Sequence, residues 1–389
     1  MDHINGLEKL DSYYFELGPI RPPSEARSLL IRATRNCSWN RCEFCPVYKG
    51  QKFELRPVGE IQQDIETAKQ ISDEIKAMSL TKGYEGRVRN IAATIHDALQ
   101  HNSSVQNVCL WLYGGGTSVF LQDANSIIMR TPDLVQVTSF LKQTFPDLER
   151  ITSYGRSKTA AKKSIEEFRQ IHEAGLSRLH IGLESGSDEV LTLVQKGCTA
   201  EDHIKGGMAV MESGIELSEY VMPGLGGRKL SKQHAQETAR VLNEINPTFI
   251  RLRSTAVYEI LPLWQRVERG EFELLRDDEI VEEIGSFISR LECHSTLKSD
   301  HVMNLLMEVE GKLPEDREKM LAIINRFVIL PPQEKLNFMV GRRLGWYNKL
   351  DDLQVSMRRE KVEQAIHQFK SDGCEDLESI MSKLKARLI

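Results

Sequence analysis

The 389-residue sequence contains no apolar run that approaches the roughly 18 residues of a membrane-spanning helix, so we expect no contact with a membrane. It also has no excess of positive charge, because 51 lysines and arginines stand against 56 aspartates and glutamates, for a net charge of −5. This balance makes nucleic acid an unlikely partner, since general nucleic-acid binders carry a basic surface. The first residues lack the basic and apolar regions of a signal peptide, and we therefore expect a cytoplasmic protein.

Disulfide bonds are not expected either, because the seven cysteines are odd in number and no secretion signal accompanies them. Three of the seven, Cys37, Cys42 and Cys45, fall within nine residues and have the spacing C-x4-C-x2-C. Thiolates this close in sequence converge on one inorganic centre. The cluster is therefore the most informative feature of the composition.

Four interpretations of the cysteine cluster remain open on spacing alone. A structural zinc site needs four ligands, and the nearest further candidates, His96 and Cys109, are far away in sequence. A redox dithiol at Cys42 and Cys45 leaves Cys37 unused. Three unrelated buried cysteines are the simplest alternative. The interpretation we favour is a [4Fe-4S] cluster held by three cysteines, with one iron open to another ligand.

Apolar runs alternate with helical periodicity between residues 28 and 255, which predicts parallel strands joined by helices. We expect strands at 28–34, 107–113, 150–153, 178–183, 216–222 and 248–253. Beyond residue 256 we expect helices alone, at 279–291, 300–309, 314–326, 333–343, 360–369 and 377–388. The fold class is therefore α/β, a partial (β/α)6 TIM-like barrel of parallel strands with a helical C-terminal region. We divide the chain into a lead at 1–27, a barrel at 28–255 and a C-terminal region at 256–389.

A cysteine loop after the first strand, followed by five more strand–helix units, resembles the radical S-adenosylmethionine (radical SAM) superfamily. The commonest family spacing is C-x3-C-x2-C, one residue shorter in the first gap, while Phe44 matches the aromatic residue usual before the last cysteine. The nearest likeness is to oxygen-independent coproporphyrinogen oxidases and to the Elp3–MiaB-like branch, which includes methylthiotransferases. The resemblance implies that Cys37, Cys42 and Cys45 hold the cluster.

Three further segments resemble the parts of the family that bind S-adenosylmethionine. The first is the glycine run Gly114-Gly115-Gly116-Thr117, which we place at the end of the second strand. The second is the stretch from Ile181 to Ser187, where Glu184 is the acidic candidate for ribose or amino contacts. The third is the segment after the fifth strand. The cofactor-binding residues implied by the resemblance are Gly114, Gly115, Gly116, Thr117, Ser153, Glu184, Lys196, Met222, Pro223, Gly224 and Arg253.

The resemblance implies reductive cleavage of S-adenosylmethionine to a 5′-deoxyadenosyl radical, which abstracts hydrogen from a substrate that we expect to be a small molecule. A flavodoxin- or ferredoxin-like protein would donate the electron, under anaerobic conditions. Asp300 and His301, placed at the start of a C-terminal helix, are the candidates for a proton donor or substrate anchor. Two alternatives stay open: a non-catalytic iron–sulfur or cofactor-binding protein, and a methylthiotransferase-like enzyme acting on nucleic acid.

Overall fold

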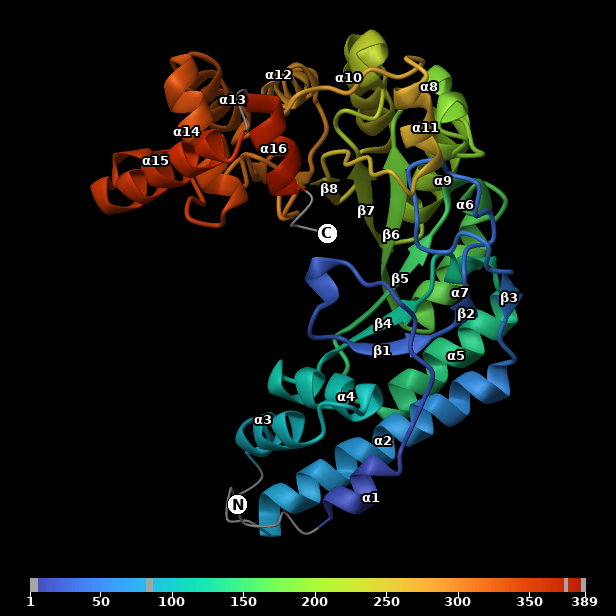
Figure 1. The fold of residues 1–389 in the computed structure, drawn as a ribbon. Helices are drawn as coiled ribbons and strands as arrows, with labels where there is room; N and C mark the ends of the chain where they lie inside the picture. The colour runs from blue at the N-terminus through green and yellow to red at the C-terminus, as the bar shows by residue number, and fades with distance from the viewer. Residues whose placement is uncertain (1–5, 82–86, 374–376, 386–389) are drawn as a thin grey trace. The chain divides into compact units, whose positions relative to one another are not determined.

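The computed structural model describes residues 6–81, 87–373 and 377–385 (Figure 1). The chain divides into two compact units that alternate along the sequence. The first unit contains Met1–Gly182 and Lys205–Leu217, and the second contains Leu183–Ile204 and Ser218–Ile389. Cys374 lies outside the described residues. Each unit contains some of the parallel strands and its own helices.

Four parallel strands form the sheet of the first unit, in the order β1-β4-β5-β6. They are β1 (Leu29–Arg32), β4 (Ser118–Gln122), β5 (Arg150–Gly155) and β6 (Leu176–Glu184), whose last two residues belong to the second unit. The register pairs Leu30 with Phe120 and Phe120 with Thr152. The strands are largely buried, as expected for parallel strands covered by helices. A separate antiparallel pair, β2 (Thr34–Arg35) and β3 (Glu54–Leu55), brackets the cysteine loop.

Helices pack on this sheet and on one another in the first unit. The long helix α2 (Val58–Thr81) packs on β1, α4 and α5, while α3 packs on α4 (Figure 1). The other helical elements are α1 (Leu7–Asp11), η1 (Pro23–Glu25), α3 (Val88–Ala98), α4 (Ser103–Tyr113), η2 (Ser126–Ile128), α5 (Thr131–Thr144), α6 (Ser157–Ala160) and α7 (Ile165–Glu173). Helix α7 begins with a capping box, in which Ser164 and Glu167 satisfy each other's backbone N–H groups.

The second unit continues with β7 (Glu216–Val221, whose first two residues belong to the first unit), β8 (Phe249–Leu252), β9 (Thr296–Lys298) and β10 (Gly311–Lys312). Strands β7, β8 and β9 are parallel, and β10 pairs antiparallel with β9. Its helices are α8 (Asp188–Leu193), α9 (Ala200–Glu212, shared with the first unit), α10 (Gly227–Ile245), α11 (Pro262–Glu268), α12 (Asp277–Ile288), α13 (Arg317–Val328), α14 (Pro332–Arg343), η3 (Leu350–Gln354), α15 (Ser356–Ser371) and α16 (Leu377–Lys385). Helix α12 packs between α10 and α13, and α14 packs on α15 and α16.

The predicted α/β class with parallel strands is confirmed, but two predicted elements are wrong. Residues 107–113 form the second half of α4, and the second strand is β4 at Ser118–Gln122. Residues 300–309 form turns after β9, a strand that the sequence analysis did not foresee. The boundaries proposed at residues 28 and 256 stay a prediction. In the described part of the chain, no helix is long and apolar enough to cross a membrane.

Candidate functional site

The three clustered cysteines lie in the loop between β2 and β3 of the first unit. All three are half-buried, and none of them forms a disulfide. The backbone N–H of Asn40 donates to Cys37 Sγ at 3.4 Å, and the N–H of Cys45 donates to the carbonyl of Cys42 at 3.3 Å. Asn36 and Asn40 both adopt positive φ, a conformation that asparagine tolerates better than most residues. These two residues turn the chain just before Cys37 and between Cys37 and Cys42.

Asp123, directly after β4, fixes the base of the cysteine loop. Its fully buried carboxylate accepts hydrogen bonds from Tyr48 Oη at 2.8 Å, from Arg32 Nε at 2.8 Å and from the Asn36 backbone N–H at 3.2 Å. Burial and the Asp123 charge raise the pKa of Tyr48, so its hydroxyl remains a donor. Sequence reasoning missed this residue, because its partners lie about 80 positions earlier in the chain.

Asn125 makes the second connection between the cysteine loop and the strand ends. Its amide donates to Ser38 Oγ at 3.0 Å and to Thr159 Oγ1 at 2.9 Å, and its carbonyl accepts from the Arg156 N–H at 3.0 Å. Ser38 adjoins Cys37, whereas Arg156 and Thr159 follow β5. The loop is thus held at the carboxyl ends of β4 and β5, the edge at which parallel α/β proteins build their sites.

The donor chemistry of the loop fits an iron–sulfur cluster. Among the residues that the structure describes, no group of three or more histidine, cysteine, aspartate or glutamate side chains is arranged to hold a metal ion. Three thiols from one short loop are the type of donor that such clusters take from proteins.

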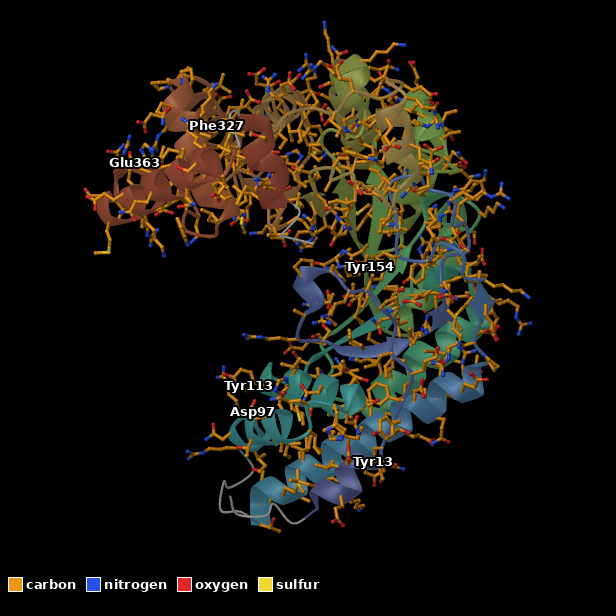
Figure 2. The ribbon with its side chains drawn as sticks, in the orientation of Figure 1. Tyr13, Asp97, Tyr113, Tyr154, Phe327 and Glu363 are labelled. Atoms are coloured by element: carbon orange, nitrogen blue, oxygen red, sulfur yellow. The ribbon has the colours of Figure 1, made fainter. Side chains whose placement is uncertain are left out.

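The glycine run does not lie where the sequence analysis placed it. Tyr113 is the last residue of helix α4 (Figure 2), and Gly114, Gly115, Gly116 and Thr117 connect this helix to the start of β4. The run therefore stands at the amino end of a strand, opposite the edge that carries the cysteine loop. Gly115 and Gly116 have φ values of 109° and 73°, so they serve the reversal from helix to strand. We no longer propose them as cofactor contacts.

Ser153, which the resemblance implies to be a cofactor contact, does not lie where it could make that contact. It lies inside β5, fully buried, and its hydroxyl donates to the carbonyls of Tyr154 at 3.1 Å and Leu121 at 3.4 Å. Tyr154 continues the strand beside it (Figure 2). A hydroxyl bonded in this way supports the sheet, and we do not propose it as a cofactor contact.

In the second unit, Glu184 and Lys196 form a largely buried ion pair at the end of β6. Lys196 Nζ donates to Glu184 Oε1 at 2.8 Å, and the two side chains are 11% and 13% exposed. Glu184 has φ of 61°, which ends the strand and turns its side chain. Its carbonyl accepts the Met222 N–H at 3.0 Å. The structure therefore brings together three of the residues that the resemblance implies.

The turn after β6 needs glycine at position 186 because there is no room for a side chain. A Cβ at this position would lie 2.3 Å from the carbonyl oxygen of Glu237 and 2.7 Å from the Cα of Thr238. The Gly186 N–H instead donates to Thr238 Oγ1 at 2.9 Å. The turn after β6 thus packs directly on the backbone of helix α10.

The loop after β7, Met222-Pro223-Gly224, rests on a buried polar network. Glu283 of α12 accepts the Gly224 N–H at 2.6 Å and the Ser231 hydroxyl. His234 of α10 bonds the Met222 carbonyl through Nε2 at 3.1 Å and Ser185 Oγ through Nδ1 at 2.8 Å. A single histidine therefore connects the loop after β7 to the turn after β6.

Replacing Glu283 by glutamine is expected to destabilise the protein by about 1.5–3 kcal/mol, because hydrogen bonds to a buried charged acceptor are of this size. Urea unfolding measures the change. Glu282→Gln is the matched control, since Glu282 is exposed on the same helix turn. Equal losses in the two variants would contradict the role assigned to Glu283.

Glu219 of β7 is fully buried, and neither carboxylate oxygen has a hydrogen-bond partner among the residues that the structure describes. Burial raises the pKa of Glu219 well above its usual value, the Glu184 charge raises it further, and Lys196 opposes both effects. The carboxyl is therefore protonated over a range in which an exposed glutamate is charged.

This raised pKa predicts that stability falls as the pH rises from about 4.5 toward the folded pKa, with a slope of at most about 1.4 kcal/mol per pH unit. The folded state binds the proton more tightly than the unfolded state in that window, so removing it favours unfolding. Glu219→Gln should lack this component, and urea unfolding from pH 4.5 to 8 would measure the difference. Parallel pH profiles for Glu219→Gln and the wild type would contradict the assignment.

Arg253, Asp300 and His301 lie at the carboxyl ends of β8 and β9. Arg253 is exposed directly after β8. Asp300 forms an ion pair with Arg251, and its side chain is 35% exposed. Burial lowers the pKa of His301 to about 4, assisted by the positive charges of Arg253 and Arg343. His301 is therefore neutral at pH 7, which suits a hydrogen-bonding residue better than a charged anchor.

No protein-family description matches the chain, but comparisons with individual proteins give consistent results. A tRNA uridine(34) acetyltransferase of Methanocaldococcus infernus is 29% identical over 123 residues, which are 31% of this chain and 23% of that relative. The chain thus matches about a quarter of the relative's length. Among solved structures, the coproporphyrinogen III oxidase of Escherichia coli, titled a radical SAM enzyme, gives a TM-score of 0.44 at 14% identity and covers 72% of this chain and 55% of its own.

A cobalamin-dependent S-adenosylmethionine radical enzyme, OxsB, gives a TM-score of 0.44 at 13% identity, with 92% of this chain and 58% of the other covered. That structure contains bound aqua-cobalamin and S-adenosylmethionine. The chain resembles the radical SAM enzymes.

The expectation that nucleic acid is an unlikely partner is contradicted. Both curated relatives, from Methanocaldococcus infernus and Methanocaldococcus jannaschii, are named as enzymes of tRNA. Net charge failed as a guide here because it sums over the whole chain, whereas nucleic acid is bound by a local group of cations.

Proposed function

We propose that this chain is a radical SAM enzyme that binds a [4Fe-4S] cluster through Cys37, Cys42 and Cys45 and cleaves S-adenosylmethionine reductively. The observation that carries the proposal is the C-x4-C-x2-C loop, anchored by Asp123 and Asn125 at the carboxyl ends of parallel strands. When bound, the cluster supplies one electron to the sulfonium, which divides the cofactor into methionine and a 5′-deoxyadenosyl radical. A flavodoxin- or ferredoxin-like protein is the proposed source of that electron.

We propose contacts with S-adenosylmethionine from Glu184, Lys196 and the loop from Met222 to Gly224. A carboxylate offers about four acceptor positions, and Lys196 uses one of those on Glu184, so the others are suited to ribose hydroxyls or an amino group. The loop from Met222 to Gly224 is proposed to pack on the adenine ring, while its own N–H groups donate to the Glu184 carbonyl and to the Glu283 carboxylate. Glu283 and His234 act as positioning residues because they hold this loop by its N–H and carbonyl groups.

Anaerobic reconstitution with iron and sulfide tests the proposal on the full chain. We expect about four irons per chain and formation of 5′-deoxyadenosine and methionine when dithionite replaces the protein reductant. A protein that binds the cluster but forms no 5′-deoxyadenosine would favour the non-catalytic alternative. A protein that takes up a single zinc ion and no iron would contradict the proposal.

We infer that RNA is the first substrate class to test, since the curated relatives are named for tRNA. One feature of the first unit favours it. Two guanidinium groups contact the Trp39 ring, with Arg41 Cζ 5.1 Å and Arg156 Cζ 5.3 Å from the ring centre. Exposed lysines at 158 and 162 follow Arg156. An aromatic ring among cations is a combination that binds bases and phosphates. A small-molecule substrate stays a prediction.

Electrophoretic mobility shifts with tRNA test this inference. The double variant Arg41→Gln, Lys158→Gln should bind roughly tenfold more weakly at moderate salt, because two phosphate contacts are lost. Lys232→Gln is the control, since Lys232 is exposed on α10 in the second unit. Equal affinity of the double variant and the wild type would exclude this surface.

A further inference from the structure

The turn that follows β9 gathers basic side chains from three parts of the second unit. Arg342 and Arg343, the last residues of α14, reach its backbone: Arg343 Nη1 donates to the Met303 carbonyl at 3.0 Å and Arg342 Nη2 to the Asn304 carbonyl at 3.4 Å. The Asn304 side chain accepts the N–H of Ser254 at 2.8 Å, the residue after Arg253. The carboxyl ends of β8, β9 and α14 therefore meet at this turn.

The positive charges here are only partly neutralised. Arg251 pairs with Asp300, and Arg343 pairs with Asp277 at 2.7 Å. Among the residues that the structure describes, no carboxylate lies within ion-pair distance of Arg253 or Arg342. Two guanidinium charges are thus left without a counter-ion.

Arg342 is the more unusual of the two because it is buried. The residue is 6% exposed, and its Nε has no hydrogen-bond partner. Burial, and then the Arg343 charge, lower the pKa of Arg342, since both disfavour a second cation at this place. The carbonyl end of helix α14 attracts a cation, but this attraction offsets only part of the cost of burying a charge without a partner.

His301 adds a neutral donor beside the arginines. The Met303 N–H donates to His301 Nδ1 at 3.2 Å, which assigns the acceptor role to this nitrogen and the proton to Nε2. The Arg253 and Arg343 charges both lower the pKa of His301. The cluster thus combines guanidinium groups and an imidazole N–H.

We propose that Arg342 and Arg253, with His301, bind an oxyanion, a phosphate or carboxylate group of the substrate. The fork of N–H donors on a guanidinium matches two oxygens of either group, and the ligand would supply the counter-charge that buried Arg342 lacks. That the oxyanion belongs to the substrate rests on the proposed function. The binding itself does not, and the test therefore measures binding alone.

Thermal unfolding of the full chain, with no S-adenosylmethionine or reductant present, tests the proposal. Inorganic phosphate, acetate and a diribonucleotide are titrated separately, each against sodium chloride at equal ionic strength. We expect phosphate to raise Tm with a saturable dependence on concentration. The half-saturating concentration should increase at least tenfold in Arg342→Gln. A response to the diribonucleotide indicates a nucleic-acid phosphate, whereas a response to acetate alone indicates a carboxylic acid.

The proposal makes a second prediction for Arg342→Gln, which would not hold if Arg342 only stabilised the fold. Without ligand this variant should have a Tm equal to or above that of the wild type, because a buried charge without a partner has been removed. Arg326→Gln is the control: Arg326 is half-exposed on α13 and pairs with Asp351, so the phosphate response should be unchanged. Should Arg342→Gln fail to fold, Arg253→Gln, at an exposed position, must show the tenfold loss instead. No response of the wild type to any of the three anions, or the same response in the variants, overturns the proposal.

Discussion

Replacing Cys42 by alanine is expected to reduce cluster content and formation of 5′-deoxyadenosine by about 100-fold or more. Cys42 is the middle ligand of the proposed three, and it begins the turn in which the Cys45 N–H donates to the Cys42 carbonyl. Loss of a partner that merely supports a metal ligand commonly costs 10–100-fold in affinity, so loss of a ligand itself should cost at least as much. Iron analysis and chromatography of the products measure the two effects.

Cys109→Ala is the matched control for this experiment. It also removes one thiol from the first unit, but Cys109 is buried in α4, where burial raises the pKa of its thiol to about 12. A thiol of this kind is a poor metal ligand, because the thiolate is the form that binds metal. Cys109→Ala should therefore retain its iron and its activity. If Cys42→Ala retained them as well, the loop would not be the site of the cluster.

The largest effect on stability is expected for Asp277→Ala, at about 3–5 kcal/mol. Arg343 donates to Asp277 Oδ2 through Nε at 3.1 Å and through Nη2 at 2.7 Å, and the two side chains are 2% and 4% exposed. Removing the carboxylate leaves the buried guanidinium without its counter-charge. Urea unfolding measures the loss.

The neighbouring residue supplies the control for Asp277. Asp278 pairs with Arg276, whose side chain is 41% exposed, so Asp278→Ala should cost no more than about 1 kcal/mol. Removing both members of the buried pair, as Asp277→Leu with Arg343→Met, should recover much of the stability lost in the single variant. A loss in Asp277→Ala no larger than in Asp278→Ala would show that the pair does not stabilise the fold.

Local periodicity predicted those parts of the fold in which it is strong. The helix expected at 333–343 agrees with α14 to within one residue, because Pro332 and Glu334 mark its first turn and Arg342 and Arg343 its last. Segment 107–113 failed because it is almost continuously apolar, a pattern shared by buried strands and buried helices. Asn102, whose side chain accepts the Val105 N–H, was the overlooked sign of a helix start.

The cysteine spacing predicted a candidate metal centre, but the residues that hold it in place could not be predicted. Asp123 and Asn125 contact the cysteine loop across about 80 positions of sequence, and single-sequence patterns carry no information on such pairings. The same holds for Glu283, which holds a loop about 60 positions earlier. Strand β9 has only three residues, too few for an alternating pattern, so Asp300 and His301 were assigned to a helix.

The division of the chain at residues 182, 204 and 217 has a consequence for how it is made. During synthesis, the amino-terminal unit cannot complete its fold when residue 182 leaves the ribosome, because it still needs the segment 205–217. Folding of this unit cannot finish until 35 further residues have emerged, 22 of which belong to the other unit. Neither unit can therefore be obtained by cutting the gene once, and a fragment that stops before residue 217 should be a target for chaperones and proteases.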